Sequence, residues 1–267
     1  MKHVTKTLAM LFLAGMVTLT ACKKDAKTSG DEISQETLAK ISNLGFSTND
    51  VQKIDEGYLV EGDIVLTAAN LAEGRPFSPS LRIAEEEQYN TNNLVIISGA
   101  SRNITVSASG NISSALSAAI QHAIARYNAQ GLRLTFSWAG TNGGGNINVS
   151  VINTGQYIAS SGFPTSSGDP YGTVKYARKY SNYSDGFMTT VIAHEIGHCI
   201  GFRHTDYMNR SYSCGIGGNE GDGGVGAHLI PGTPSEPDAA SWMLACLSST
   251  TDRPFNGNDV TALNYLY

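Results

Sequence analysis

Three histidines and a glutamate lie within one short stretch in the second half of the chain. From His194 to His204 the sequence is H-E-I-G-H-C-I-G-F-R-H. Residues four apart on a helix lie on one face, one turn above the other, so His194 and His198 can reach the same ion. Glu195 lies beside them and can reach a water molecule at that ion. The spacing therefore predicts a metal centre built on a helix.

Gly201 is where this helix must end, because glycine accepts the left-handed conformation that a sharp exit requires. The chain can then double back, and His204 supplies a third nitrogen. Three protein ligands with an open fourth position are the arrangement of a catalytic zinc, whereas a structural zinc usually has four. We expect Zn²⁺ bound by His194, His198 and His204, with Glu195 as the general base. His228 receives no role.

The eleven residues resemble the zinc motif of the metzincin metallopeptidases. H-E-I-G-H in particular is similar to the bacterial dual-action HEIGH metallopeptidases, with astacins as more distant relatives. The resemblance extends from about Leu94 to the end of the chain, and it implies a methionine turn beneath the metal. Ser241-Trp242-Met243 matches the S-x-M pattern of that turn. Without the zinc motif, an ordinary core methionine would be the better interpretation of Met243.

Two positions depart from the astacin pattern. Thr205 follows the third histidine, where astacins carry glutamate. Ala245 stands two residues after the methionine, where astacins and serralysins place a tyrosine near the zinc. The chain is therefore not a plain astacin, and we expect no tyrosine ligand from that position.

The resemblance implies an α+β fold, with a twisted mixed sheet, an active-site helix and a small irregular C-terminal subdomain. It also implies that Gly172–Ala177 is the edge strand above the substrate cleft, although an interior strand is the alternative. Hydrophobic periodicity predicts the elements themselves. They are a helix from Asn111 or Ser113 to about Gln130, strands at Leu132–Trp138, Asn146–Asn153 and Gly172–Ala177, a helix at Gly186–Ile200 and a last helix from Asn258.

The N-terminal residues have the form of a targeting segment. Lys2 and Lys6 precede an apolar run from Leu8 to Val17, which is too short to span a bilayer. The run ends at L-T-A-C, which resembles a bacterial lipobox with Cys22 as the lipidated residue. A plain signal peptide with an unrelated cysteine is the alternative.

These features divide the chain into four parts. We expect a lipoprotein signal peptide at 1–22, a tether at 23–32, a pro-segment at 33–92 and the catalytic domain at 93–267. The protein would then be exported to the bacterial cell envelope, in the periplasm or on the outer surface, through an N-terminal lipid anchor in the membrane. Release after processing is a further expectation.

The composition of the chain limits the classes of partner that it can bind. The net charge is −5 and only 15% of residues are charged, which argues against nucleic acid because phosphate binding needs a basic face. The metzincin resemblance implies a protein or peptide substrate, and we expect a monomer.

The cysteines beyond Cys22 are odd in number: Cys199, Cys214 and Cys246. An exported chain meets an oxidising compartment, so one bridge is expected. Three pairings are open, and we favour Cys214–Cys246 because it would tie the glycine-rich loop to the methionine turn, with Cys199 as a buried thiol.

The predicted pro-segment contains Val60-Glu61-Gly62-Asp63-Ile64. This stretch resembles the F-x-G-D of astacin pro-segments, in which the aspartate occupies the open zinc position. The resemblance implies that Asp63 is a zinc ligand of a zymogen, since a carboxylate oxygen is a good zinc ligand. A bend in a small accessory domain is the alternative.

The function predicted for the whole chain is that of a zinc-dependent endopeptidase that hydrolyses peptide bonds with metal-activated water. The alternative is a surface lipoprotein that binds a partner or glycan and keeps a zinc centre without using it. An intact Glu195 favours the enzyme, because an idle site has no need of a general base.

Overall fold

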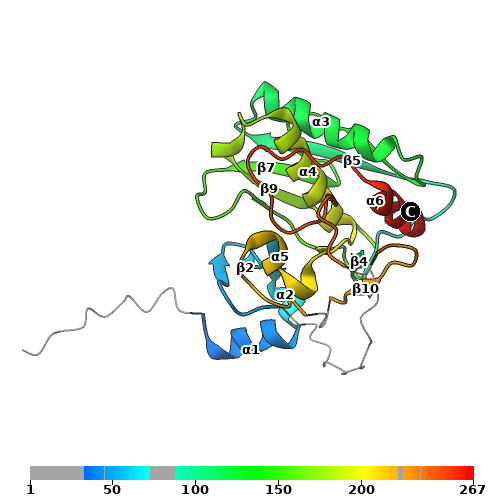
Figure 1. Cartoon of the computed structure of the whole chain (residues 1–267). Helices are drawn as coiled ribbons and strands as arrows, with labels where there is room; N and C mark the ends of the chain where they lie inside the picture. The colour runs from blue at the N-terminus through cyan, green and yellow to red at the C-terminus, as the bar shows by residue number, and fades with distance from the viewer. Residues whose placement is uncertain (1–32, 45, 73–87, 222–224, 235) are drawn as a thin grey trace, which may run out of the picture. The chain divides into compact units, whose positions relative to one another are not determined.

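The computed structural model describes residues 33–44, 46–72, 88–221, 225–234 and 236–267 (Figure 1). Residues 33–267 belong to one compact unit. The predicted signal peptide, the tether and Cys22 lie outside the described residues. Among the helices that the structure does describe, none combines the length and the apolar character needed to cross a membrane.

A five-stranded mixed sheet forms the centre of the fold, in agreement with the predicted α+β class. All neighbouring strands run parallel except β8, which is antiparallel to β9. The alternate residues Ile104, Val106 and Ala108 of β5 point to one face of the sheet and are buried completely. In sheet order the strands are β6 (Leu134–Trp138), β5 (Arg102–Gly110), β7 (Ile147–Ile152), β9 (Thr173–Ala177) and β8 (Ala159–Ser160).

The prediction that Gly172–Ala177 forms the edge strand was wrong. β9 lies between β7 and β8, and β8 is the strand at the edge. Polar side chains such as Thr173 and Lys175 are typical of an edge strand, but here both are half-buried, and Lys175 forms an ion pair with Glu56 of the N-terminal segment, residues 33–72. The polar alternation therefore marks a face of the sheet that the N-terminal segment partly covers.

Two helices pack against each other beside this sheet, α3 (Ser114–Asn128) and α4 (Asp185–Ile200). Each begins at a serine, Ser113 and Ser184, whose hydroxyl accepts a backbone N–H of the first turn. Every residue of α4 from Phe187 to Ile200 is buried, which is the pattern of a helix covered on all sides. α4 is therefore a rigid base for the side chains that it carries.

Residues 33–72 form a small substructure with its own apolar cluster. Three strands make an antiparallel sheet, and β2 and β3 are joined by a tight turn in which Glu61 and Gly62 have positive φ angles of 56° and 91°. The stretch from Tyr58 to Leu66 has the sequence of one strand with a glycine in its middle, whereas the structure has a hairpin there. The elements are α1 (Gln35–Asn43), β1 (Gln52–Ile54), β2 (Gly57–Val60), β3 (Ile64–Thr67) and α2 (Ala68–Ala72).

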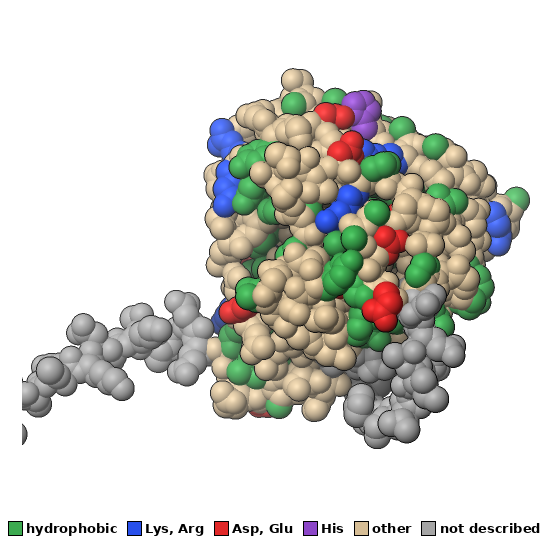
Figure 2. Space-filling view, viewed as in Figure 1, with side chains coloured by type: hydrophobic (Ala, Val, Ile, Leu, Met, Phe, Trp, Pro, Cys, Tyr) green, Lys and Arg blue, Asp and Glu red, His purple; other side chains and the backbone are tan. Residues whose placement is uncertain are grey.

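Beyond α4 the chain is largely irregular, as predicted. Its short elements are η2 (Tyr207–Asn209), α5 (Ser211–Cys214) and β10 (His228–Leu229), which pairs with β4 (Tyr89–Asn90). Helix α6 (Gly257–Leu266) closes the chain, and η1 (Arg178–Tyr180) follows β9. On the face drawn in Figure 2, the charged side chains of the described residues are scattered among uncharged ones, as the low charge content leads one to expect.

Candidate metal centre

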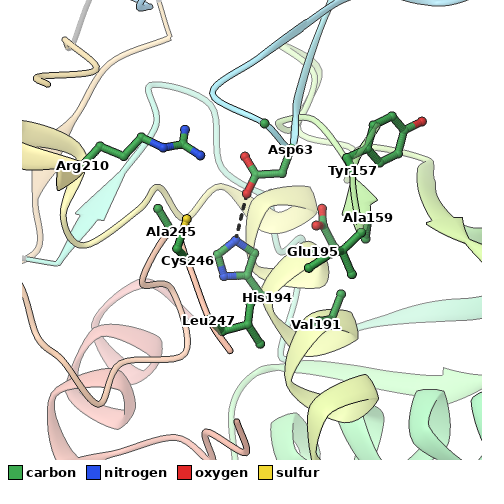
Figure 3. Close-up of a pocket in the computed structure, with 12 residues that line it drawn as sticks. Asp63, Tyr157, Ala159, Val191, His194, Glu195, Arg210, Ala245, Cys246 and Leu247 are labelled. Atoms are coloured by element: carbon green, nitrogen blue, oxygen red, sulfur yellow. Dashed lines mark ion pairs between the residues drawn. The ribbon is translucent and has the colours of Figure 1, made fainter. Parts of the chain in front are cut away.

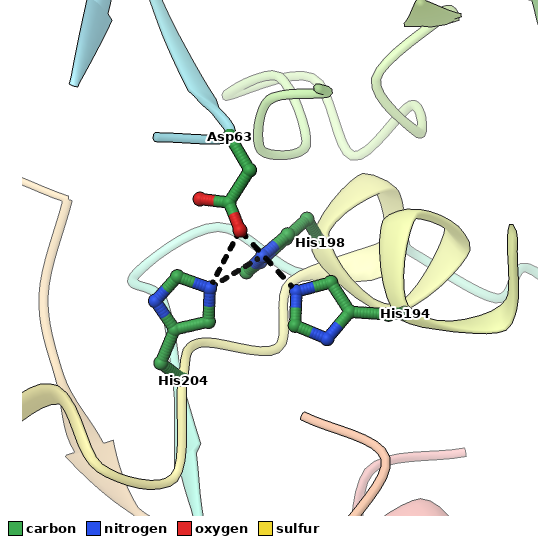
Figure 4. A group of neighbouring side chains, drawn as sticks. All are labelled: Asp63, His194, His198 and His204. Atoms are coloured by element: carbon green, nitrogen blue, oxygen red, sulfur yellow. Dashed lines mark hydrogen bonds and ion pairs between the residues drawn. The ribbon is translucent and has the colours of Figure 1, made fainter. Parts of the chain in front are cut away.

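Helix α4 and the turn that follows it bring the three histidines together (Figure 4). His194 and His198 lie one turn apart, and Gly201 ends the helix in the left-handed conformation with a φ of 112°. The turn returns His204 to the helix, so that its Nε2 lies 3.2 Å from Nε2 of His198. The three Nε2 atoms belong to a group of ligand atoms that all lie within 4.8 Å of one another.

Each imidazole ring is held through its other nitrogen. Nδ1 of His194 lies 2.8 Å from the carbonyl oxygen of Trp242, and Nδ1 of His198 lies 2.8 Å from that of Phe202. Nδ1 of His204 lies 3.0 Å from a carboxylate oxygen of Glu220. With Nδ1–H donating to an oxygen, each Nε2 keeps its lone pair for an ion, which is the usual arrangement around metal-binding histidines.

Asp63 supplies a fourth ligand atom from the turn between β2 and β3. Its Oδ2 lies 3.1 Å from Nε2 of His204 and 3.6 Å from Nε2 of His194 (Figure 4). The turn that carries Asp63 and the segment that carries the histidines are far apart in the sequence but adjacent in the structure. The Asp63 side chain is only 13% exposed. Asp63 therefore occupies the side of the three-histidine group that the helix leaves open.

These four atoms fit zinc. Ligand atoms at 2.0–2.1 Å from a tetrahedral zinc lie roughly 3.3 Å from one another, close to the separations found here. Nε2 of His194 is buried and has no hydrogen-bond partner, and the same is true of Oδ1 of Asp63. Buried polar atoms without partners are costly, and a bound cation would satisfy the histidine nitrogen.

Burial and neighbouring side chains shift the pKa values of His198 and Asp63 in this centre. Burial lowers the pKa of His198 well below its ordinary value, which favours the neutral ring that a metal ligand needs. Burial would raise the pKa of Asp63, but the rings of His204, His194 and His198 together lower that pKa well below its ordinary value. Asp63 is therefore present as a carboxylate.

Met243 lies beneath the helix that carries the ligands. A Cβ atom at Gly197 would lie 2.5 Å from Sδ of Met243, so only glycine allows this approach. The carbonyl oxygen of Met243 accepts the N–H of Thr205, directly after the third histidine. The turn at Met243 thus supports both the helix and the chain that returns after it, and the glycine of H-E-I-G-H is needed for packing rather than for chemistry.

Glu195 faces a cavity of about 220 Å³ beside the histidines (Figure 3). Burial raises the pKa of its carboxyl well above the ordinary value, and the neighbouring Asp63 adds to the rise. The cavity is lined mainly by apolar side chains, with Arg210 on one side. Ala245 and the apolar residues Tyr157, Val191 and Leu247 contribute to this lining.

The other residues singled out in the sequence lie outside the centre. Cys214 and Cys246 form a disulfide, and Cys199 is a buried free thiol on α4. His228 is exposed and contacts Asn92, and His122 is exposed and pairs with Asp185.

Two residues of the site have no signal in the sequence. Glu220, which holds His204, follows the third histidine by 16 residues within a glycine-rich loop. Ser161 donates a hydrogen bond to Oε2 of Glu195 from the end of the edge strand β8. Neither belongs to a motif, and only folding brings them to the motif residues.

A metal centre of three histidines, two of them with a glutamate on a buried helix and the third on the turn that follows it, within an α+β domain, defines a metal-dependent hydrolase. The sequence matches the model of the dual-action HEIGH metallo-peptidase family over residues 58–267. The match covers most of the chain, which therefore belongs to this family and is a metallopeptidase. The matched range includes Asp63 as well as the three histidines.

Comparison with solved structures shows only a similarity of fold. A structure of myroilysin is 14% identical, with a TM-score of 0.45, and the alignment covers 66% of this chain and 96% of that one. High choriolytic enzyme 1, a hatching enzyme zinc-protease from Oryzias latipes, is 16% identical, with a TM-score of 0.41 and coverage of 65% and 93%. None of the curated proteins matches the chain by sequence. The family assignment rests on the family model alone.

Proposed function

We propose that this metallopeptidase is a zinc endopeptidase in which Glu195 is the general base and Asp63 keeps the unprocessed chain latent. The observation that carries the proposal is the convergence of three histidine Nε2 atoms next to Glu195, with the carboxylate of Asp63 on their remaining side.

The chemistry divides between the ion and the chain. A bound zinc ion supplies Lewis acidity, which polarises a carbonyl group and makes a water molecule acidic near neutral pH. Glu195 accepts the proton of the attacking water at a carboxylate oxygen and delivers it to the leaving amine. The apolar cavity walls exclude bulk water around the carboxylate, and each of the three imidazoles is held in place through its Nδ1.

Latency follows from the position of Asp63. Its carboxylate occupies the place that a water or substrate oxygen needs, so hydrolysis requires that Asp63 leave. Main-chain bonds hold it there, because the carbonyl oxygen of Asp63 accepts the N–H of Ser161 and the carbonyl oxygen of Ser161 accepts the N–H of Val65. An extended peptide can use the same main-chain groups of Ser161 once the segment has left.

Arg203 contacts two side chains of residues 33–72 inside the protein. The Arg203 guanidinium lies 3.7 Å from the carboxylate of Glu61 and packs against the ring of Phe46 at 5.2 Å. Arg203 itself belongs to the zinc motif and is 1% exposed. Residues 33–72 thus contact both the histidines of the metal centre and Arg203 directly beside them.

The test compares the full-length, zinc-loaded chain with three variants on unfolded casein. Asp63→Ala should hydrolyse casein at least tenfold faster than the unprocessed wild type, since a single good metal ligand is removed. Asp63→Ala combined with Glu195→Gln should be inactive at equal zinc content, because the amide cannot accept the proton. Asp55→Ala, at an exposed aspartate of the same segment, is the matched control.

Equal activity of Asp63→Ala and the wild type would refute the latency. Unchanged activity after Glu195→Gln would refute the general base. Absence of casein hydrolysis in every form would favour instead a binding protein that keeps zinc unused.

A further inference from the structure

Ser161 stands next to the proposed general base without belonging to the zinc motif. Its hydroxyl lies 2.6 Å from Oε2 of Glu195 and 3.1 Å from the carbonyl oxygen of the same residue. A hydroxyl has one proton to donate, and 2.6 Å is the length of a charge-assisted bond from a hydroxyl to a carboxylate. The proton therefore goes to the carboxylate.

Glu195 has little else to orient it. Among the residues that the structure describes, the Ser161 hydroxyl is the only group with a hydrogen bond to the Glu195 carboxylate. Both residues are buried, Ser161 at 0% and Glu195 at 2% exposure, so water does not replace this donor freely. One oxygen of the carboxylate is thereby anchored, and the other, Oε1, is left to accept a proton.

The main chain of Ser161 is fixed as well. It follows the edge strand β8, and its N–H and carbonyl oxygen pair with Asp63 and Val65 of the N-terminal segment. A strand that forms hydrogen bonds with the N–H and the carbonyl oxygen of Ser161 holds its hydroxyl in place next to Glu195. Ser161 therefore pairs with a neighbouring strand through its main chain and orients the Glu195 carboxylate through its side chain.

We propose that Ser161 is the positioning residue of Glu195. It holds the carboxylate through Oε2, and a peptide paired with its main chain holds Ser161 in turn. This inference rests on the proposed role of Glu195 as general base. It adds a residue that acts through Glu195, outside the metal ligands and remote from them in the sequence.

The adjacent residue provides a matched control. Ser160 is buried to the same extent, and its hydroxyl has no hydrogen-bond partner. Ser160→Ala and Ser161→Ala remove the same oxygen from neighbouring buried positions, and only the second removes the bond to Glu195. Both changes reduce volume, so neither forces the strand apart.

The experiment uses the full-length chain with Asp63→Ala as the active parent. Ser161→Ala, Ser161→Thr, Ser160→Ala and Glu195→Gln are added to it singly. The measurements are kcat and KM on a fluorogenic peptide, zinc content, and unfolding in urea. We expect Ser161→Ala to lower kcat by about tenfold to a hundredfold, the usual range for a residue that orients another, with KM changed less than about threefold.

Zinc content should be unchanged, and Ser161→Thr, which keeps the hydroxyl, should recover most of kcat. Ser160→Ala should match the parent in kcat and KM. A kcat of Ser161→Ala equal to that of Ser160→Ala would overturn the role of Ser161 alone, and so would a loss explained by lost zinc or by unfolding in urea. An inactive parent or an active Glu195→Gln would overturn the proposed function, and the role of Ser161 with it.

Discussion

Glu220 is the residue on which the third metal ligand depends. It holds Nδ1 of His204 at 3.0 Å, and it lies between two arginines, Arg203 at 3.6 Å and Arg210 at 3.5 Å. Burial would raise the pKa of Glu220, but His204 and the arginines lower it, so the carboxylate is charged. A charged acceptor fixes the ring and makes Nε2 a better donor to the ion.

We predict that Glu220→Ala weakens zinc affinity by about tenfold to a hundredfold, because His204 loses its orientation. Competition with a chelator of known affinity measures the change. Glu220→Gln should weaken zinc affinity less, since its amide oxygen can still accept a hydrogen bond from Nδ1 of His204. Glu236→Ala removes an exposed glutamate and serves as the control. Equal affinity of Glu220→Ala and Glu236→Ala would contradict the prediction.

A second prediction concerns Gly197. An added Cβ would meet Sδ of Met243 at 2.5 Å and Nε1 of Trp242 at 3.1 Å. Both side chains are fully buried, so Gly197→Ala should lower the free energy of unfolding by about 1–3 kcal/mol, the usual cost of overpacking. Unfolding in urea measures it. At Gly155 an added Cβ meets nothing within 4 Å, so Gly155→Ala should be nearly neutral.

Among the elements, the segment after α4 has the least regular structure and is tied to the methionine turn by several bonds. Asp206 accepts the hydroxyl of Ser213 at 2.6 Å and the N–H of Ala245 at 3.0 Å. The disulfide Cys214–Cys246 joins α5 to the same stretch, with a sequence separation of 32. These links connect the short helix α5 to the wall of the cavity.

We predict that Cys214→Ala combined with Cys246→Ala lowers the free energy of unfolding by about 3–4 kcal/mol, from the loop entropy of a bridge of this span. Thermal unfolding with and without a reducing agent measures it. The reducing agent should destabilise the wild type and leave the double variant unchanged. A reducing agent that acts equally on both proteins would show that the bridge does not form.

For the molecule as a whole, the described residues belong to one unit in which Asp63 of residues 33–72 lies against the three histidines. The preceding residues still carry the prediction of a lipid anchor, which would place the enzyme in the bacterial cell envelope. An anchored chain that is latent until processed would act only where a second protease meets it. Release from the membrane and activation would then follow from cleavages in the same N-terminal region.

We predict that the N-terminal residue of the exported chain is Cys22 with a lipid attached. Mass spectrometry of the protein from a membrane fraction should show an N-terminal fragment heavier than the unmodified one by the mass of the acyl groups. Cys22→Ala should move the protein to the soluble fraction. A free thiol at the mature terminus, or cleavage at another bond, would rule out the anchor.

The zinc motif determined much of this protein from the sequence alone. The positions of His194, His198 and Glu195 follow from the helical repeat, and the turn at Gly201 follows from the conformational freedom of glycine. These are local rules, so adjacent residues suffice to apply them. The same holds for the hydrophobic faces of α3 and the strands. Asp63 was suggested only by a resemblance to the F-x-G-D of astacin pro-segments, with a bend in a small accessory domain as the alternative.

Only the tertiary structure decided which distant residues meet the motif. It placed Asp63 3.1 Å from His204, Glu220 on the same ring, and Ser161 on Glu195. It also showed that β9 is an interior strand and β8 the edge, because strand order depends on pairings between segments and not on the composition of one strand. Contacts across 16, 34 and 141 residues leave no periodic trace in the sequence, and so the packing of the folded chain had to supply them.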